Sequence, residues 1–127
     1  MFKNSLKIVL LIGFCFINSC SNDFDYGTPQ KAVETLDISN LSQSTVMISG
    51  KVDTDNGSTI TSRGICYSTN SLPTILDFSK QDASSTLGNF SCTLDNLTPN
   101  TIYFARAFAT NSYGTAYGKE VTFTTLP

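Results

Sequence analysis

The segment 97–111, LTPNTIYFARAFATN, restricts what this chain can fold into more than any other part of it. Its second half alternates between one face with Tyr103 and three alanines, and another with the bulkier Phe104, Arg106 and Phe108. A period of two is typical of a β-strand. We therefore expect a long strand whose tyrosine and alanine side faces a core.

A turn precedes this strand. Pro99 and Asn100 favour a turn, and a tyrosine shortly after such a turn can bury its ring and return its hydroxyl group to the nearby backbone. We expect Tyr103 to do so, in an arrangement that resembles the tyrosine corner of β-sandwich proteins.

The composition supports an all-β chain and excludes several classes of function. Ser and Thr are frequent, and there are nine Phe, five Tyr and no Trp, which suits strands and turns better than helices. The net charge is −2 and the basic residues are scattered, so no basic face exists for binding nucleic acid.

Catalytic and metal-binding signals are also missing from the sequence. The absence of His removes the commonest general base and the imidazole ligand. No motif resembles a nucleophile elbow, a phosphate-binding glycine loop or a zinc-binding cysteine pair. We expect no catalytic residue, no cofactor and no metal, and a protein that is not an enzyme.

The N-terminus has the pattern of an export signal. Lys3 and Lys7 form a short positive region before the apolar run at 8–17. This run is too short to span a bilayer as a mature helix. The run ends in the tetrapeptide INSC, whose last residue is Cys20, and this resembles the lipobox of bacterial lipoproteins. The resemblance implies a signal peptide at 1–19 and lipidation of Cys20. The alternatives are an ordinary secretory signal cut nearby and an uncleaved anchor.

Lipidation would attach the protein to a membrane. A diacylated and N-acylated cysteine, carrying acyl chains such as palmitate, buries many methylene groups at about 0.8 kcal/mol each. Ser21 after the cysteine implies the outer membrane by resemblance, and Asp23 and Asp25 resemble the signals that export some lipoproteins to the cell surface. Residues 20–32 are then the lipidated N-terminus and a flexible tether.

Strand patterns fill the rest of the chain and are separated by turn residues. Lys119 shares the parity of the inward Val121 and Phe123 and does not suit an apolar core, so we expect the last strand to break near Gly118. We expect strands at 33–39, 46–52, 60–69, 76–80, 88–94 and 102–110, and a last strand that includes 121–123.

The stretch DTDNG at 53–57 allows two interpretations. Spaced carboxylates followed by Gly are similar to the opening of a calcium-binding loop. However, Gly64 stands where the bidentate Glu of such a loop belongs. We therefore expect an Asn-Gly turn between the strands at 46–52 and 60–69.

Five motifs stand at compatible spacing along the chain: RGICYSTN at 63–70, PT at 73–74, LTPNTIY at 97–103, ATNS at 109–112 and GTAYG at 114–118. Together they resemble the fibronectin type III-like domains of bacterial surface proteins. The resemblance implies an all-β, immunoglobulin-like antiparallel β-sandwich of about seven strands, in one domain at 33–126. This chain has Gly50 in the second strand, where the animal domains carry a core Trp.

Two cysteines remain in the domain, Cys66 and Cys92. Both fall on faces that we interpret as inward, and in this architecture their strands belong to opposite sheets. Export to an oxidising compartment permits a disulfide between the sheets. Cysteine is also a good small core residue, so two buried free thiols are the alternative.

The outward side of the long strand is the predicted interaction face. If Cys66 points inward, then Ile65 and Tyr67 point outward beside Phe104, Arg106 and Phe108. Apolar, aromatic and arginine side chains are enriched at interfaces. The alternative is that the next segment of the chain, or the tether, folds over this face.

These observations predict a lipid-anchored, non-catalytic surface module at the outer membrane that binds or presents a protein or glycan partner. One alternative is a structural spacer or accessory subunit of a larger assembly. Another is a weak carbohydrate-binding module, in which Tyr67, Tyr113 and Tyr117 stack on sugar rings. Each alternative depends partly on analogy, because this kind of fold hosts many functions.

Overall fold

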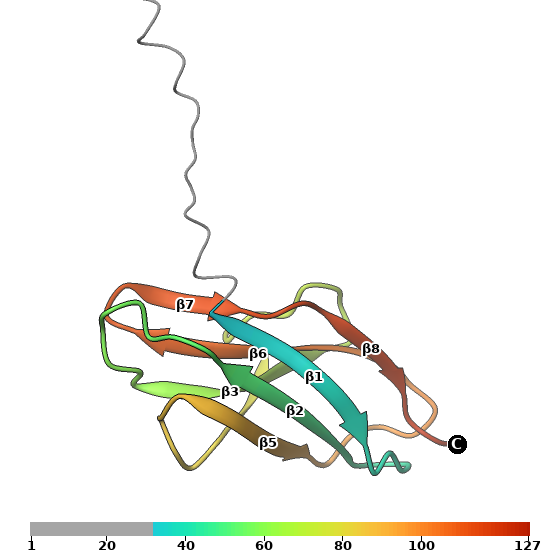
Figure 1. The fold of residues 1–127 in the computed structure, drawn as a ribbon. Coiled ribbons are helices and arrows are strands. Elements are labelled where there is room, and N and C mark those ends of the chain that lie inside the picture. The colour runs from blue at the N-terminus through green and yellow to red at the C-terminus, as the bar shows by residue number, and fades with distance from the viewer. Residues whose placement is uncertain (1–31) are drawn as a thin grey trace, which may run out of the picture.

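The structure is a computed structural model, and it describes residues 32–127 (Figure 1). The predicted signal peptide, Cys20 and most of the predicted tether lie outside these residues. Every regular element described is a β-strand. The described residues therefore include no helix that is long and apolar enough to cross a membrane. The strands are β1 (Val33–Ser39), β2 (Val46–Val52), β3 (Ser62–Ser68), β4 (Phe78–Gln81), β5 (Gly88–Leu94), β6 (Ile102–Asn111), β7 (Gly114–Tyr117) and β8 (Val121–Thr124).

The strands form two antiparallel sheets that pack face to face (Figure 1). One sheet has the order β1-β2-β5, and the other has the order β4-β3-β6-β7, with β8 pairing to β6 beyond β7. This confirms the all-β sandwich. It contains eight strands because the last predicted strand is split into β7 and β8.

The split occurs at Gly118, where the sequence predicts a break. The Gly118 amide donates a hydrogen bond to the Ala107 carbonyl at 2.8 Å. A Cβ on Gly118 would lie 2.6 Å from Oγ1 of Thr35, so β1 passes too close for any larger residue. Oγ1 of Thr35 in turn accepts a hydrogen bond from the Ala107 amide at 2.9 Å, which joins the two sheets.

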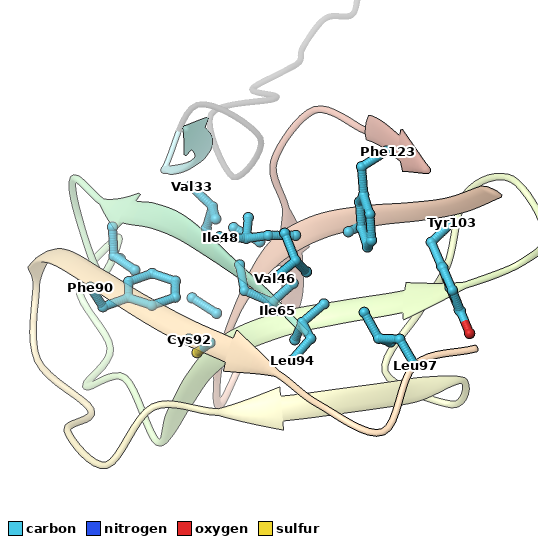
Figure 2. Close-up of a cluster of buried hydrophobic side chains, with 14 of the residues drawn as sticks. Val33, Val46, Ile48, Ile65, Phe90, Cys92, Leu94, Leu97, Tyr103 and Phe123 are labelled. Carbon is cyan, nitrogen blue, oxygen red and sulfur yellow. The ribbon is translucent and has the colours of Figure 1, made fainter. Parts of the chain in front are cut away.

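The core lies between the two sheets, and both sheets contribute side chains to it (Figure 2). On β6, Tyr103 and the three alanines at 105, 107 and 109 are buried in it, as the alternation predicts. Gly50 faces the same core, and a Cβ there would lie 2.6 Å from the ring of Phe90 and 3.0 Å from Cβ of Ala107. Phe90 is Gly50's cross-strand partner, so its ring fills the space above the glycine.

The loop between β2 and β3 contains the predicted Asn-Gly turn. Asn56 and Gly57 have φ values of 52° and 88°, as a type I′ turn requires. The Ser58 amide donates to the Asp55 carbonyl at 3.0 Å, and the Gly57 amide donates to Oδ1 of Asp55 at 2.9 Å. The Asp55 carboxylate therefore closes the turn.

Candidate functional site

The tyrosine corner fixes the orientation of β6. The hydroxyl oxygen of Tyr103 accepts a hydrogen bond from the Thr98 amide at 3.0 Å. Its ring stacks on Phe123 with centroids 5.6 Å apart, and only 6% of the residue is exposed. The corner predicted from the sequence is confirmed, and with it the division of β6 into a core face and an outer face.

The register of β3 against β6 corrects one prediction. Ile65 pairs with Ala107 and Tyr67 with Ala105, so Ile65 and Tyr67 share the core face. Ile65 is fully buried. The prediction that Ile65 and Tyr67 point outward is wrong, and it is Cys66 that lies on the outer face of the sheet.

Arg63 is a charged residue on the core side of β3, and its polar partners neutralise and satisfy its guanidinium there. Arg63 is 4% exposed, and its guanidinium forms an ion pair with Asp82 at 2.8 Å and donates to the carbonyls of Thr86 and Gly88. It also lies 4.8 Å from the centroid of the Phe90 ring. No local sequence pattern identifies this ion pair, because the partners of Arg63 follow β4 in the chain.

The two cysteines are free thiols in different sheets, Cys66 in β3 and Cys92 in β5. Cys66 points outward, and its thiol lies 3.4 Å from the Pro73 carbonyl. Cys92 belongs to the core between the sheets. The predicted disulfide alternative is therefore wrong, because β3 has the opposite parity. Burial raises the pKa of each thiol to about 11.

The chain between β3 and β4 covers much of the predicted interaction face. Nε of Arg106 donates to the Pro73 carbonyl at 2.7 Å, and the Ile75 amide donates to the hydroxyl oxygen of Tyr117 at 3.1 Å. The Arg106 guanidinium lies 4.1 Å from the centroid of the Tyr117 ring. Residues 69–77, here called the covering segment, thus lie over the sheet, as the alternative interpretation expects.

Two other predicted face residues also lie on the outer side. Phe104 and Phe108 pair with Ser68 and Gly64 of β3, which places them on the face opposite the core. Phe104 is half-buried, whereas Phe108 is only 2% exposed. Of the five predicted contact residues, only Phe104 and Arg106 combine an outward direction with partial exposure.

The covering segment itself presents apolar side chains to solvent. Leu72 is 61% exposed and Leu76 is 92% exposed. The backbone of Leu72 has a φ of 57°, which is unusual for a bulky residue. The carboxylate of Glu120 holds this turn by accepting hydrogen bonds from the Ser71 hydroxyl and the Leu72 amide.

A cleft of about 490 Å³ opens at the other end of β3 and β6. It lies between the loop that joins β2 to β3 and the hairpin that joins β6 to β7, beside the start of β1. Its lining contains apolar residues and uncharged polar ones: Ala32, Val33, Thr54, Asn56, Ile60, Ala109, Asn111, Tyr113, Gly114, Thr115 and Ala116.

Hydrogen bonds tie the two walls of the cleft together. The side-chain Nδ2 of Asn111 donates to the Asp55 carbonyl at 2.9 Å, across the two walls. Within the hairpin, Oδ1 of Asn111 accepts from the Tyr113 backbone amide at 2.8 Å. The hydroxyl groups of Ser58 and Ser112 lie 2.7 Å apart. The loop and the hairpin are therefore connected by side chains as well as by the sheet.

The described part of the chain holds no cluster suited to a metal ion. Within residues 32–127, no group of three or more His, Cys, Asp or Glu side chains is placed to bind one. The carboxylates of Asp55, Asp82 and Glu120 instead accept hydrogen bonds from turn backbones or from Arg63.

No protein-family model and no curated protein matches this sequence. Among solved structures, the sensor domain of the anti-sigma factor RsgI4 from Pseudobacteroides cellulosolvens is similar, with a TM-score of 0.56 and 23% identity. That match covers 74% of this chain and 92% of the other.

Two animal structures are also similar. The chicken CNTN1 FN1-FN3 domains match with a TM-score of 0.56 and 24% identity, covering 73% of this chain and 32% of that one. The domain of human fibronectin type III domain containing protein 3 matches with a TM-score of 0.53 and 18% identity, covering 87% and 93%. Together with the two sheets and the tyrosine corner, these likenesses show that the described chain is a fibronectin type III-like β-sandwich domain.

Proposed function

We propose that this protein is a non-catalytic binding module, held at the outer membrane by lipid on Cys20 and displayed at the cell surface. The observation that carries the proposal is the position of the domain relative to the lipobox-like sequence. The first described residue, Ala32, is buried in the domain, so only residues 21–31 would separate the lipid from it. Eleven residues reach at most about 40 Å when fully extended.

The partner on this proposal is a protein or a glycan at the cell surface. The domain offers two surfaces that its own packing does not use: the cleft and the exposed apolar side chains of the covering segment. Both are held by hydrogen bonds to other elements, so neither needs extensive ordering when a partner binds.

Metabolic labelling with a palmitate analogue tests the anchor. We expect label on the wild-type protein and none on Cys20→Ala, whose precursor stays uncut or whose protein leaves the membrane fraction. Cys15→Ala is the matched control, because Cys15 lies within the predicted signal and should leave the label unchanged. Equal label on Cys20→Ala and the wild type would show that Cys20 is not the lipidated residue.

A second candidate function, an accessory subunit of a larger outer-membrane assembly, is favoured by the covering segment. Leu72, Leu76 and Phe78 are each more than 60% exposed within seven residues, and such grouped apolar exposure is typical of contact surfaces. A photo-crosslinker at position 76 in intact cells should then join the protein to one assembly partner. The same group at the exposed Ser91 of β5 is the control, and similar products from both positions would argue against this role.

A further inference from the structure

We propose that the cleft between the β2–β3 loop and the β6–β7 hairpin binds a neutral oligosaccharide. This inference rests on the proposed binding function and names its ligand class. It uses the described residues that line the cleft and none of the residues on the covered outer face.

The charge of the lining favours a neutral ligand. None of the described residues that line the cleft carries a charged side chain. An acidic ligand would therefore lose hydration without gaining an ion pair, and the same holds for a basic one. Buried floor residues such as Val33, Ile60 and Ala109 offer an apolar surface to the less polar face of a ligand.

Tyr113 supplies an aromatic platform at the rim. It is 74% exposed, although a tyrosine gains little stability for the fold in that position. The faces of its ring are available to the C–H groups of a sugar, while its hydroxyl can exchange hydrogen bonds with a sugar hydroxyl. Its backbone is fixed by Asn111, and Gly114 follows it with a φ of 134°.

Polar groups at the rim are available for sugar hydroxyls. Among residues 32–127, no hydrogen-bond partner is placed for the side-chain amide of Asn56 or for the hydroxyl of Tyr113. Oγ1 of Thr54 accepts from the Asn56 amide at 3.0 Å and keeps its proton free to donate. These groups provide both donors and acceptors, as recognition of hydroxyl groups requires.

The dimensions of the cleft are consistent with a short oligosaccharide. A volume of about 490 Å³ falls within the range typical of small-molecule sites. Ala32 lines the cleft, so the ligand would sit at the end of the domain that the tether enters. The tether is the competing occupant of the cleft, and the test below distinguishes the two.

The test uses the full mature chain, extracted in detergent, and titrates it by calorimetry. The probes are neutral gluco-, manno- and galacto-oligosaccharides, with uronic-acid oligomers as the charged comparison. We expect at least one neutral series to bind and the charged series not to bind. Tyr113→Ala should weaken binding at least tenfold and Asn56→Ala several-fold, without changing the midpoint of thermal unfolding.

Phe78→Ala is the matched control, because Phe78 is an exposed aromatic residue that does not line the cleft. Binding that survives Tyr113→Ala, preference for the charged series, or no binding of any neutral series would overturn the inference. The last result is also what a cleft filled by the tether would give. None of these outcomes alters the labelling of Cys20, so the proposed anchor stands or falls separately.

Discussion

The side chain of Tyr103 connects the core of this domain to the loop that precedes β6. Its ring packs between the sheets against Phe123, and its hydroxyl accepts from the Thr98 amide five residues earlier. The same residue thus ties the loop before β6 to the core. Without this hydroxyl the part-buried Thr98 amide would lose its acceptor, and that loss costs free energy.

We predict that Tyr103→Phe lowers the free energy of unfolding by about 1 to 3 kcal/mol, because it leaves the part-buried Thr98 amide without its acceptor. Chemical denaturation measures this change. Tyr113→Phe removes a hydroxyl from an exposed tyrosine and should change stability by less than about 0.5 kcal/mol. Equal midpoints for Tyr103→Phe and the wild type would show that the corner bond contributes nothing.

The two buried thiols predict a loss of stability at alkaline pH. Burial raises the pKa of Cys66 and Cys92 from 9.0 to about 11, so the unfolded chain loses these protons first as the pH rises. Their contribution to stability is complete below pH 9 and falls toward pH 11, by about 3 kcal/mol per thiol at most.

Denaturation curves at pH 8, 9, 10 and 11 test this effect. The double variant Cys66→Ala with Cys92→Ala should be less stable at pH 8, because it leaves cavities, but its stability should fall less steeply above pH 9. Parallel pH profiles for the variant and the wild type would show that the thiols do not cause the decline. Both thiols in the native wild type should also react slowly with alkylating reagents near neutral pH.

At the scale of the element, strands with one exposed face were predictable and the strand with two buried faces was not. The strands at 33–39, 46–52 and 88–94 have the predicted bounds, because their residues alternate between core and solvent. In β3 the core lies on one side and the covering segment on the other, so every residue from Arg63 to Cys66 is buried. Without alternation, the sequence does not show which side faces the core.

The same cause limited the prediction of the candidate site. A one-residue error in parity moves every side chain of a strand to the opposite face. In β3, this error in parity puts Ile65 and Tyr67 on the predicted contact face and Cys66 in the predicted core, the reverse of the observed arrangement. The covering segment and the Arg63 ion pair depend on contacts distant in sequence, such as Arg106 with Pro73, which no local pattern reports.

The pairing of Gly50 with Phe90 is a second feature of this scale. A Cβ on Gly50 would overlap the Phe90 ring at 2.6 Å, so Gly50→Ala should displace the ring and the Arg63 guanidinium above it. We predict a loss of about 1 to 3 kcal/mol, the usual range for overpacking a core. Thermal unfolding measures it, with Ser49→Ala on the opposite face of β2 as the control. A Gly50→Ala protein as stable as the wild type would show that Phe90 moves at no cost.

At the scale of the whole molecule, the domain presents its two unused surfaces in different places. The cleft is lined in part by Ala32, at the start of the described chain, and the covering segment lies on the outer face of the larger sheet. On our proposal, the short tether keeps the cleft close to the membrane. The covering segment is then the surface available to a neighbouring subunit.

The central claim is that this domain is a lipid-anchored module, and the intact mass of the protein tests it most directly. The protein would be extracted from its own membranes with detergent and measured by mass spectrometry. We predict the mass of residues 20–127 plus a diacylglyceryl group and an amide-linked acyl chain, with all of the added mass on the N-terminal Cys20 peptide. The unmodified mass of residues 20–127, or the mass of residues 1–127, would contradict the claim.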